Sequence, residues 1–421
     1  MRVTTFMRKV IGIPGLKVTG VFEEDGSLVV GVRPNWLDPR CSGCGKRPPR
    51  QRKGGAKVAN PSRRWRHLDL AGIKLFLAYD LRWVYCPSCG RSAEQVPWAS
   101  DPRARFTVEF DQHVAFLAQR NDKTTVQNLM RITWETVGRC VDRAVRLLRP
   151  QNPLANLTAI GVDELSYRKH QHYVTLVTDH VERRIVWGKE GRSAKTLSAF
   201  FEQLGEEGRK KIEFVSMDLS GAYRKAVDDN VPHAEKVYDR FHVQALASTA
   251  LDETRREEWN RLRTKHGRGS DEAKALKGLR WVLLRDGLSL DQADQARLSE
   301  IQRDNARLYR AYLMKEKLGD VLDGRQPNVA RRLLEKWCSW AVRSRLPAFV
   351  RTGRTIRRHM DGIVAYVRYR ITNGLVEGLN NKARLATRQA YGFHSAAAVL
   401  AMISLRCSGL DLRPVHRRLA A

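Results

Sequence analysis

Three acidic residues stand where they could share metal ions. Asp163 lies inside one predicted strand, Asp218 ends another, and Glu377 lies on a predicted amphipathic helix. Phosphodiester chemistry with two metal ions needs carboxylates from separate elements that converge on ions about 3.5–4 Å apart. An early strand, the end of a neighbouring strand and a helix that crosses the sheet suit this purpose. These residues therefore predict a two-metal phosphodiester site.

Each acid has an ordinary explanation when it is taken alone, because the chain has 45 acidic residues and Asp is common at strand ends. Side chains alternate along a strand, so Glu164 is expected to point away from Asp163 and from its site. Asp239 and His242 are rival metal ligands, since they follow another strand-like run. A lone His is more often structural.

The predicted helix around Glu377 has two faces. The apolar face carries Val376, Leu379 and Ala383, and the polar face carries Glu377 and Asn381. Basic residues on this segment could hold phosphates beside a metal-bound carboxylate, although a solvated row of mixed charge would look the same. The basic residues are Lys382, Arg384 and Arg388.

Two C-x-x-C pairs near the N-terminus predict a structural zinc site. Cys41 and Cys44 form the first pair, Cys86 and Cys89 the second, and a glycine that eases the tight turn follows each pair. Tetrahedral zinc takes four thiolates, and such a site has no open position for chemistry. The alternatives are four unrelated cysteines or a redox dithiol. The other cysteines are predicted core residues: Cys140, Cys338 and Cys407.

Two basic segments predict contacts with nucleic acid. The segment between the C-x-x-C pairs carries Arg63, Arg64 and Arg66, which suit backbone phosphates unless the loop is merely solvated. Downstream, residues 123–131 predict a short helix, and Thr133 can cap a second helix, Trp134–Leu148. A helix with one packed face and one arginine face suits a major groove, although an ordinary amphipathic surface helix looks similar. Its arginines are Arg139, Arg143 and Arg146.

The composition agrees with a nucleic-acid partner. The 421 residues predict about three domains, and 76 Lys and Arg against 45 Asp and Glu leave a net charge of +31. Such an excess repels itself unless a polyanion offsets it. No apolar run is long enough to span a bilayer, and the start lacks the apolar region of a signal peptide. We therefore expect an intracellular protein that binds nucleic acid and no membrane.

The elements that must position these residues change along the chain. The first hundred residues read as β-rich, with a hairpin turn at Asp25-Gly26, and two or three short helices follow. A linker then leads to three strand-like runs, a helix, a strand, a helix and a strand. Residues 243–352 read as almost wholly helical, and a further helical section follows.

Several strings together resemble the ISL-three family of bacterial insertion-sequence transposases. They occur in the family's order and cover nearly the whole chain, and the paired cysteines match its N-terminal zinc-binding segment. The strings are Gly161-Val-Asp-Glu, Ser216-Met-Asp-Leu-Ser-Gly-Ala-Tyr223, Tyr238-Asp-Arg-Phe-His-Val243, Thr372-Asn-Gly-Leu-Val-Glu-Gly-Leu-Asn-Asn-Lys382 and Ala390-Tyr-Gly-Phe393.

The resemblance implies a multidomain α+β protein. A zinc ribbon and a helix-turn-helix would precede an RNase H-like α/β catalytic domain that an all-helical insertion interrupts. The expected parts are a zinc-binding, β-rich DNA-binding domain, a helix-turn-helix, the first part of the catalytic core, the insertion, and the second part of the core with Glu377. Their bounds are 1–105, 106–150, 155–242, 243–352 and 353–421.

The resemblance also implies a DDE-type transposase with Asp163, Asp218 and Glu377 as its triad. The expected cofactors are two Mg²⁺ (or Mn²⁺) ions at the triad and a structural Zn²⁺. The expected partner is double-stranded DNA, both terminal inverted repeats and target, bound by a homodimer or larger assembly in the bacterial cytoplasm, with the nucleoid. Two alternatives remain: a transposase-derived DNA-binding regulator without catalysis, and a metal-dependent nuclease that cuts without joining.

Overall fold

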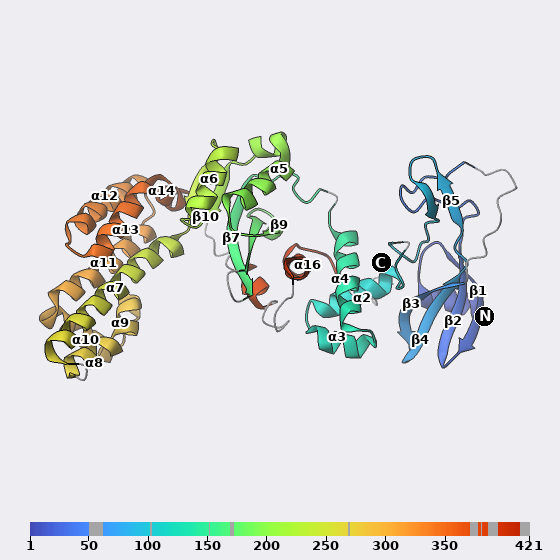
Figure 1. Cartoon of the computed structure of the whole chain (residues 1–421), viewed down its shortest axis with the longest axis horizontal. Helices are drawn as coiled ribbons and strands as arrows, with labels where there is room; N and C mark the ends of the chain where they lie inside the picture. The colour runs from blue at the N-terminus through green and yellow to red at the C-terminus, as the bar shows by residue number, and fades with distance from the viewer. Residues whose placement is uncertain are drawn as a thin grey trace. The chain divides into compact units, whose positions relative to one another are not determined.

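The computed structural model divides the chain into two compact units. Unit 1 comprises Met1–Pro153 and Lys382–Ala421, and unit 2 comprises Leu154–Asn381. The structure describes residues 1–49, 62–101, 103–150, 152–168, 172–267, 270–370, 378–379, 381–385 and 395–412. Figure 1 labels the elements of both units. No helix within these described ranges combines the length and apolar character that a membrane crossing needs.

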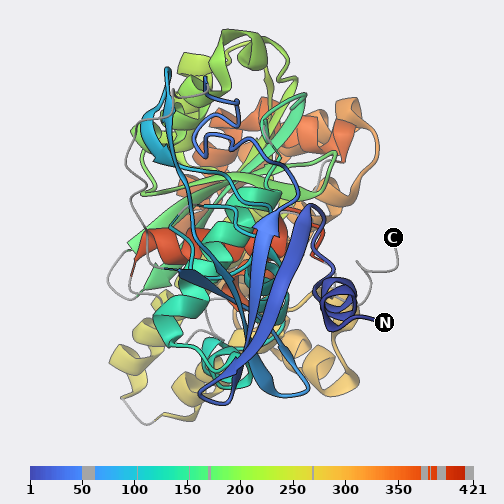
Figure 2. The same cartoon turned by 90° about the vertical axis from the view of Figure 1, so that its right-hand side faces the viewer.

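Unit 1 begins with a four-stranded sheet and a two-stranded hairpin. The sheet has the order β1-β2-β4-β3, and β5 pairs with β6. Figure 2 shows the N-terminal helix α1 beside strands β1 and β2. The core of the sheet includes Trp65 and Trp98, whose rings meet edge to face at 5.6 Å. The bounds are α1 Val3–Ile11, β1 Leu16–Glu24, β2 Ser27–Pro34, β3 Arg63–Leu70, β4 Ile73–Tyr79, β5 Trp83–Cys86 and β6 Gly90–Ala93.

The first hairpin turns where the sequence predicts. Glu24 pairs with Ser27 across the turn. Asp25 and Gly26 both have positive φ, at 47° and 66°. A two-residue turn needs positive φ at both central positions to match the twist of the strands, and Asp-Gly adopts this conformation readily.

The predicted helix-turn-helix is present and has a third helix. Asp122 caps α3 by accepting the Thr125 N–H at 2.9 Å, and Thr133 caps α4 by accepting the Thr136 N–H at 3.3 Å. Arg131 ends α3 in a left-handed conformation, with φ of 53°. The bounds are α2 Val108–Ala118, α3 Lys123–Met130 and α4 Trp134–Leu148.

Helix α16 (Ala396–Cys407) packs on the helix-turn-helix within unit 1. The Gln119 side chain donates to the Leu405 carbonyl at 2.7 Å, and Arg406 donates to the Ala118 carbonyl at 3.2 Å. Residues from Lys382 onward, α16 included, belong to unit 1, while the expected second part of the catalytic core, 353–421, remains a prediction.

Unit 2 is built on a mixed five-stranded sheet of order β11-β10-β7-β8-β9. Strands β7, β8 and β9 are antiparallel neighbours, while β10 pairs parallel to both β7 and β11. The order along the chain is three strands, a helix, a strand, a helix and a strand, as the sequence predicts. The bounds are β7 Ala159–Arg168, β8 His172–Asp179, β9 Arg184–Glu190, α5 Ala194–Lys210, β10 Phe214–Met217, α6 Gly221–Asn230 and β11 Glu235–Tyr238.

A long series of helices follows β11. The bounds are α7 Arg240–His266, α8 Asp271–Gly278, α9 Arg280–Leu284, α10 Gln292–Asp304, α11 Ala306–Asp323, α12 Pro327–Arg343, α13 Pro347–Arg358 and α14 Met360–Tyr369, with a 3-10 turn at Gly287–Ser289. These helices share one hydrophobic core with the sheet. Helix α14 packs on β11 so closely that a Cβ at Gly362 would lie 2.4 Å from Cδ2 of Tyr238. The helical region therefore packs as one body with the sheet.

The predicted fold class is confirmed. Hairpins carry the cysteines, a helix-turn-helix follows, and a mixed sheet continues into a helical region. The helical region begins at Arg240 rather than at residue 243, because Asp239 caps α7 by accepting the Phe241 N–H at 3.3 Å.

Candidate metal centres and nucleic-acid interface

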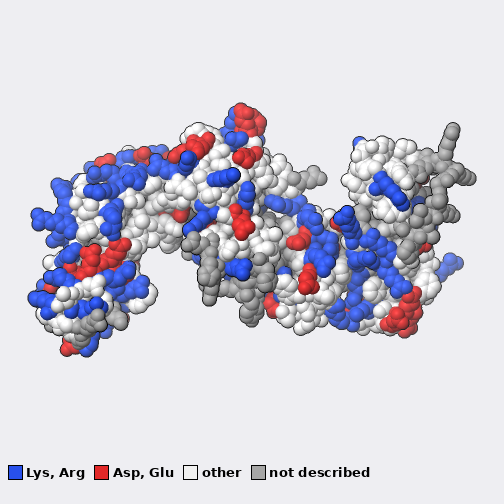
Figure 3. All heavy atoms as spheres, in the orientation of Figure 1, with Lys and Arg blue, Asp and Glu red and all other residues white. Residues whose placement is uncertain are grey.

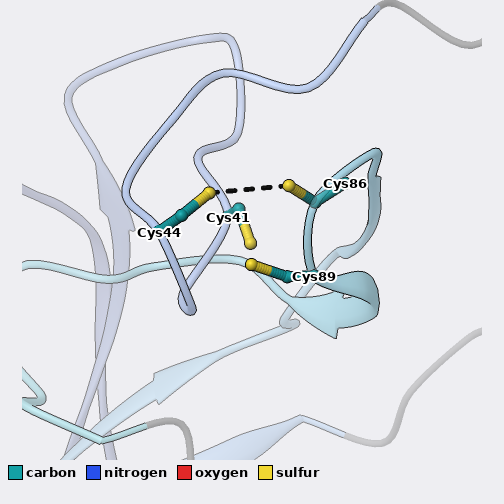
Figure 4. Close-up of side chains that lie close together, drawn as sticks. All are labelled: Cys41, Cys44, Cys86 and Cys89. Carbon is teal, nitrogen blue, oxygen red and sulfur yellow. Dashed lines mark hydrogen bonds between the residues drawn. The ribbon is translucent and has the colours of Figure 1, made fainter.

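The four paired cysteines meet at one point, as Figure 4 shows. Their sulfur atoms all lie within 4.8 Å of one another, and Cys44 and Cys86 are 3.5 Å apart. Cys41 and Cys86 are buried, whereas Cys44 and Cys89 are exposed. Among the described residues this is the only group of three or more His, Cys, Asp or Glu side chains arranged to hold a metal. Four converging thiols fit tetrahedral zinc.

The thiols of this cluster differ in acidity. A hydrogen bond from Ser92, 3.3 Å from the sulfur, is the main cause that lowers the pKa of Cys41 to about 6. A hydrogen bond with Cys44 raises the pKa of Cys89 to about 12. Crowded thiols cannot all ionise without a cation, which a bound zinc ion would supply.

A buried carboxylate fixes the knuckles to the sheet of unit 1. Glu94 forms an isolated bridge with Cys41, and its side chain is completely buried. It accepts three bonds from the Arg82 guanidinium, at 2.7, 3.0 and 3.0 Å, and one from the Tyr79 hydroxyl at 2.8 Å. The hydrogen bond to Glu94 is also the main cause that raises the pKa of Arg82. These charge-assisted bonds hold the cluster on rigid strands.

The two aspartates of the predicted triad come from β7 and from the end of β10, which are adjacent parallel strands of unit 2 (Figure 1). Gly161 of β7 is in register with Ser216 of β10. Asp163 and Asp218 each follow by two residues, so Asp163 lies on β7 and Asp218 directly after the end of its neighbour. Both side chains are half-buried. Asp163 accepts the Glu164 N–H at 2.7 Å, and Asp218 accepts the Ser220 N–H at 3.0 Å.

The electrostatics show that Glu164 also lies near this site, which the alternation argument did not predict. Burial raises the pKa of Glu164, and the charge of Asp218 raises it further, while Arg192 and His242 lower it. The Arg192 guanidinium is 4.0 Å from the Glu164 carboxylate. Like charges that raise one another's pKa are relieved by a divalent cation, and carboxylate oxygens are the ligands that Mg²⁺ prefers.

Tyr223 of α6 is affected by the same carboxylates. Its pKa is raised by burial and by the charges of three carboxylates, those of Glu164, Asp218 and Asp163. Its hydroxyl lies 3.0 Å from that of Thr175, the cross-strand neighbour of Glu164. Tyr223 and Thr175 were not singled out from the sequence, although Tyr223 closes the string that contains Asp218.

The rival ligands lie at the end of the next strand. Met217 is in register with Tyr238, so Asp218 and Asp239 leave adjacent parallel strands side by side. Asp239 is buried and caps α7, which gives it a structural role. The His242 ring lies 4.0 Å from Asp239 and is half exposed.

Glu377 and Arg388 lie outside the described residues, so their predicted roles remain predictions. The described part of the same segment follows the predicted faces, since Leu379 and Ala383 are buried. Lys382 and Arg384 are exposed.

The predicted arginine face of α4 divides into two kinds of residue. Arg139 and Arg146 are exposed. Arg143 forms a two-pronged ion pair with the buried Asp111 of α2, at 2.6 and 2.7 Å. Burial raises the pKa of Asp111, and its bonds to Arg143 oppose that shift. Arg143 therefore joins two helices, and we do not retain it as a DNA contact.

The predicted arginines of β3 also divide. Arg66 is buried and paired with Asp69, so it too is not retained as a DNA contact. Arg64 is exposed and paired with Glu24, and Arg63 donates to the Ala104 carbonyl at 3.0 Å. On the face drawn in Figure 3, Lys and Arg gather over the helices and sheet of unit 1.

Comparisons with known proteins agree with these sites. A transposase family model of the ISL3 (ISL-three) group matches residues 160–403, and the helix-turn-helix model of the same family matches residues 94–145. The transposase for insertion sequence element IS1557 of Mycobacterium tuberculosis is 37% identical over 412 residues, which cover 92% of this chain and 91% of the relative. The transposase for insertion sequence element IS1001 of Bordetella parapertussis is 28% identical over 333 residues, 79% of this chain and 81% of the relative.

Proposed function

Because the chain belongs to the ISL3 family of insertion-sequence transposases and carries a DDE-type domain, we propose that it binds the terminal inverted repeats of its element and performs metal-dependent DNA cleavage and strand transfer. The observation that carries the catalytic part is the pair of aspartates. Asp163 lies on β7 and Asp218 directly follows the adjacent parallel strand β10, in a site where the charges of three carboxylates raise the pKa of Tyr223.

Asp163, Asp218 and Glu377 are the proposed ligands of two Mg²⁺ or Mn²⁺ ions. Such ions, when bound, supply an activated water or 3′-hydroxyl and neutralise charge on the leaving oxygen. Strands β7 and β10 position the two aspartates, and Glu377 is proposed to complete the set. Glu164 is a neighbouring carboxylate that a substitution must separate from the triad.

DNA recognition is assigned to unit 1. The exposed Arg139 and Arg146 of α4 face solvent, and the four-Cys cluster supports the neighbouring sheet through Glu94. Lys382, Arg384 and Arg388 are proposed phosphate contacts. Two element ends must be joined in one complex, so we propose a homodimer or larger assembly on the DNA of the bacterial cell.

A donor-end assay tests this proposal. The full chain is incubated with labelled terminal DNA of its own element and a target plasmid, with and without Mg²⁺. We expect end binding in both conditions and joined product only with the ion. Binding without cleavage would identify a DNA-binding regulator, and nicking without joining would identify a nuclease. Either result would overturn the proposed function.

A further inference from the structure

A groove beside the β5–β6 hairpin of unit 1 is lined by residues that have no role in the proposed function. It encloses a cavity of about 720 Å³ between the β5–β6 hairpin, the start of β3 and the segment before α2. We call it the arginine groove. It is lined by Trp83 and four arginines: Arg63, Arg91, Arg103 and Arg105.

Positive charge dominates the lining of the arginine groove. No carboxylate lines it, and within the described residues none of its four arginines forms an ion pair. The Nε of Arg63 is buried without a hydrogen-bond partner among these residues. Asp101 is the carboxylate whose charge reaches Arg63, against the opposing charge of Arg105. Converging guanidinium groups of this kind fit phosphate oxygens.

Two exposed aromatic side chains lie on β5, and one of them, Trp83, lines the arginine groove. Trp83 and Tyr85 are 43% and 52% exposed, while Val84 and Cys86 between and after them are buried. Side chains two residues apart on a strand point to the same side, so both rings lie on one face of β5. The Arg91 guanidinium lies 4.8 Å from the centre of the Trp83 ring and stacks against it. Exposed aromatic rings on a strand, next to a basic groove, are the usual platform for unpaired bases.

We propose that the arginine groove binds single-stranded DNA, with bases stacked on Trp83 and Tyr85 and phosphates held by the four arginines. Paired bases in a duplex are already stacked on one another and offer no free face to these rings, so the aromatic pair favours unpaired nucleotides over a duplex. The inference deepens the proposed function, because the strand would be one that becomes unpaired at an element end. It rests on DNA binding by unit 1 and not on the acidic triad.

The test is fluorescence anisotropy of the full zinc-bound chain with a labelled short oligothymidine and, separately, with duplex terminal DNA. Magnesium and chelators are both left out. We expect Trp83→Ala to weaken oligothymidine binding about tenfold and to leave duplex affinity unchanged. Trp83→Phe keeps a stacking ring and should retain most of the affinity. Arg103→Ala should reduce the salt slope for oligothymidine by about 0.7, the value for one phosphate contact.

The chain offers a matched control in unit 2. Trp281 is 65% exposed and has the Arg280 guanidinium 5.0 Å from its ring, but it lies outside the arginine groove. Trp281→Ala should change neither affinity. The zinc content of each variant shows that the hairpin is folded, and Arg103→Ala tests the groove independently of the hairpin.

Several outcomes would overturn this inference. One is an equal loss of oligothymidine affinity in Trp83→Ala and Trp281→Ala. Another is that Trp83→Ala weakens duplex binding as much as oligothymidine binding. A third is that the chain binds oligouridine more tightly than oligothymidine and that this binding depends on Trp83. The last would assign the groove to RNA. Loss of strand transfer with intact oligothymidine binding would overturn the proposed function alone. Absence of oligothymidine binding with intact strand transfer would overturn this inference alone.

Discussion

The knuckles and helix-turn-helix of unit 1 and the aspartate site of unit 2 treat their buried and half-buried charges in opposite ways. In unit 1 the acids are matched by arginines: Glu94 is bound by Arg82, and Asp111 by Arg143. In the aspartate site of unit 2, burial and the charge of Asp218 raise the pKa of Glu164, and the Arg192 guanidinium is 4.0 Å from Glu164. Matched pairs fix the position of helices and knuckles. Carboxylates that repel one another instead have a raised affinity for cations.

The two candidate metal centres also differ, in how completely their ligands could surround an ion. The four thiols of unit 1 come together within 4.8 Å, and a tetrahedral thiolate site closes the coordination of its ion. Such an ion contributes to folding. The carboxylates of unit 2 stand on adjacent strands, and hard cations held by few carboxylates keep positions for water and phosphate oxygens. We therefore expect a structural role for the thiol centre and a chemical role for the carboxylate centre.

The largest effect should follow removal of zinc from unit 1. Cys86→Ser takes away one ligand of the cluster, and apparent zinc-binding free energies in small zinc domains are about 10–16 kcal/mol. We expect the β5–β6 hairpin to lose protection from hydrogen exchange and DNA-end binding to fall, while the sheet of unit 2 keeps its protection. Cys338→Ser alters a cysteine outside the cluster and is the control for metal content. Full end binding by a zinc-free protein would remove the structural role.

The next effect separates catalysis from folding in unit 2. Asp163→Asn should reduce strand transfer at least about a thousandfold, because it removes metal-dependent stabilisation of several kcal/mol. End binding and thermal stability should be unchanged, because the substitution that removes the charge of Asp163 also removes its repulsion with the neighbouring carboxylates. Glu164→Gln, one residue along the same strand, is the matched control and should retain most activity. Loss of strand transfer in Glu164→Gln, with activity retained in Asp163→Asn, would assign the metal site to Glu164.

Local rules predicted the elements but not the pairings between them. Caps, turns and periodicity placed the Asp25-Gly26 hairpin and helix Trp134–Leu148, because these features depend on neighbours in the sequence. Whether Arg143 faces DNA or Asp111 depends on α2, which is separate in sequence. The nearness of Glu164 to Asp218 likewise depends on how β10 pairs with β7. Strand alternation alone could not predict it.

The buried Asp111–Arg143 pair gives the third prediction. Arg143→Ala leaves a buried carboxylate without its partner and should destabilise the helix-turn-helix by about 3–5 kcal/mol. The measurement is the urea midpoint or the hydrogen exchange of α2 and α4. The double variant Asp111→Ala with Arg143→Ala should recover part of the loss. Loss of DNA affinity without loss of stability would restore Arg143 to the DNA-contact set.

Acid should weaken both units through one buried histidine each. Burial lowers the pKa of His67 and of His180 to about 4, from the usual 6.5. The folded state therefore favours the neutral ring, and stability is full above pH 6.5 and falls as pH drops toward 4. For His67 the loss is up to about 3 kcal/mol. His67→Asn should remove this pH dependence from the exchange of β3 and α2 and leave that of unit 2 unchanged. The same pH dependence of β3 and α2 exchange in the unaltered chain and in His67→Asn would contradict this prediction.

The smallest effect concerns the exposed arginine that contrasts with Arg143 on the same helix. Arg139→Ala removes no ion pair between described residues, so stability should stay within about 0.5 kcal/mol. End affinity should fall by about 1–3 kcal/mol if Arg139 reads a base, with the loss confined to one repeat sequence. If it contacts a phosphate, affinity should fall on all duplexes and the salt slope should drop by about 1. Unchanged affinity on every duplex would place the DNA on another face of α4.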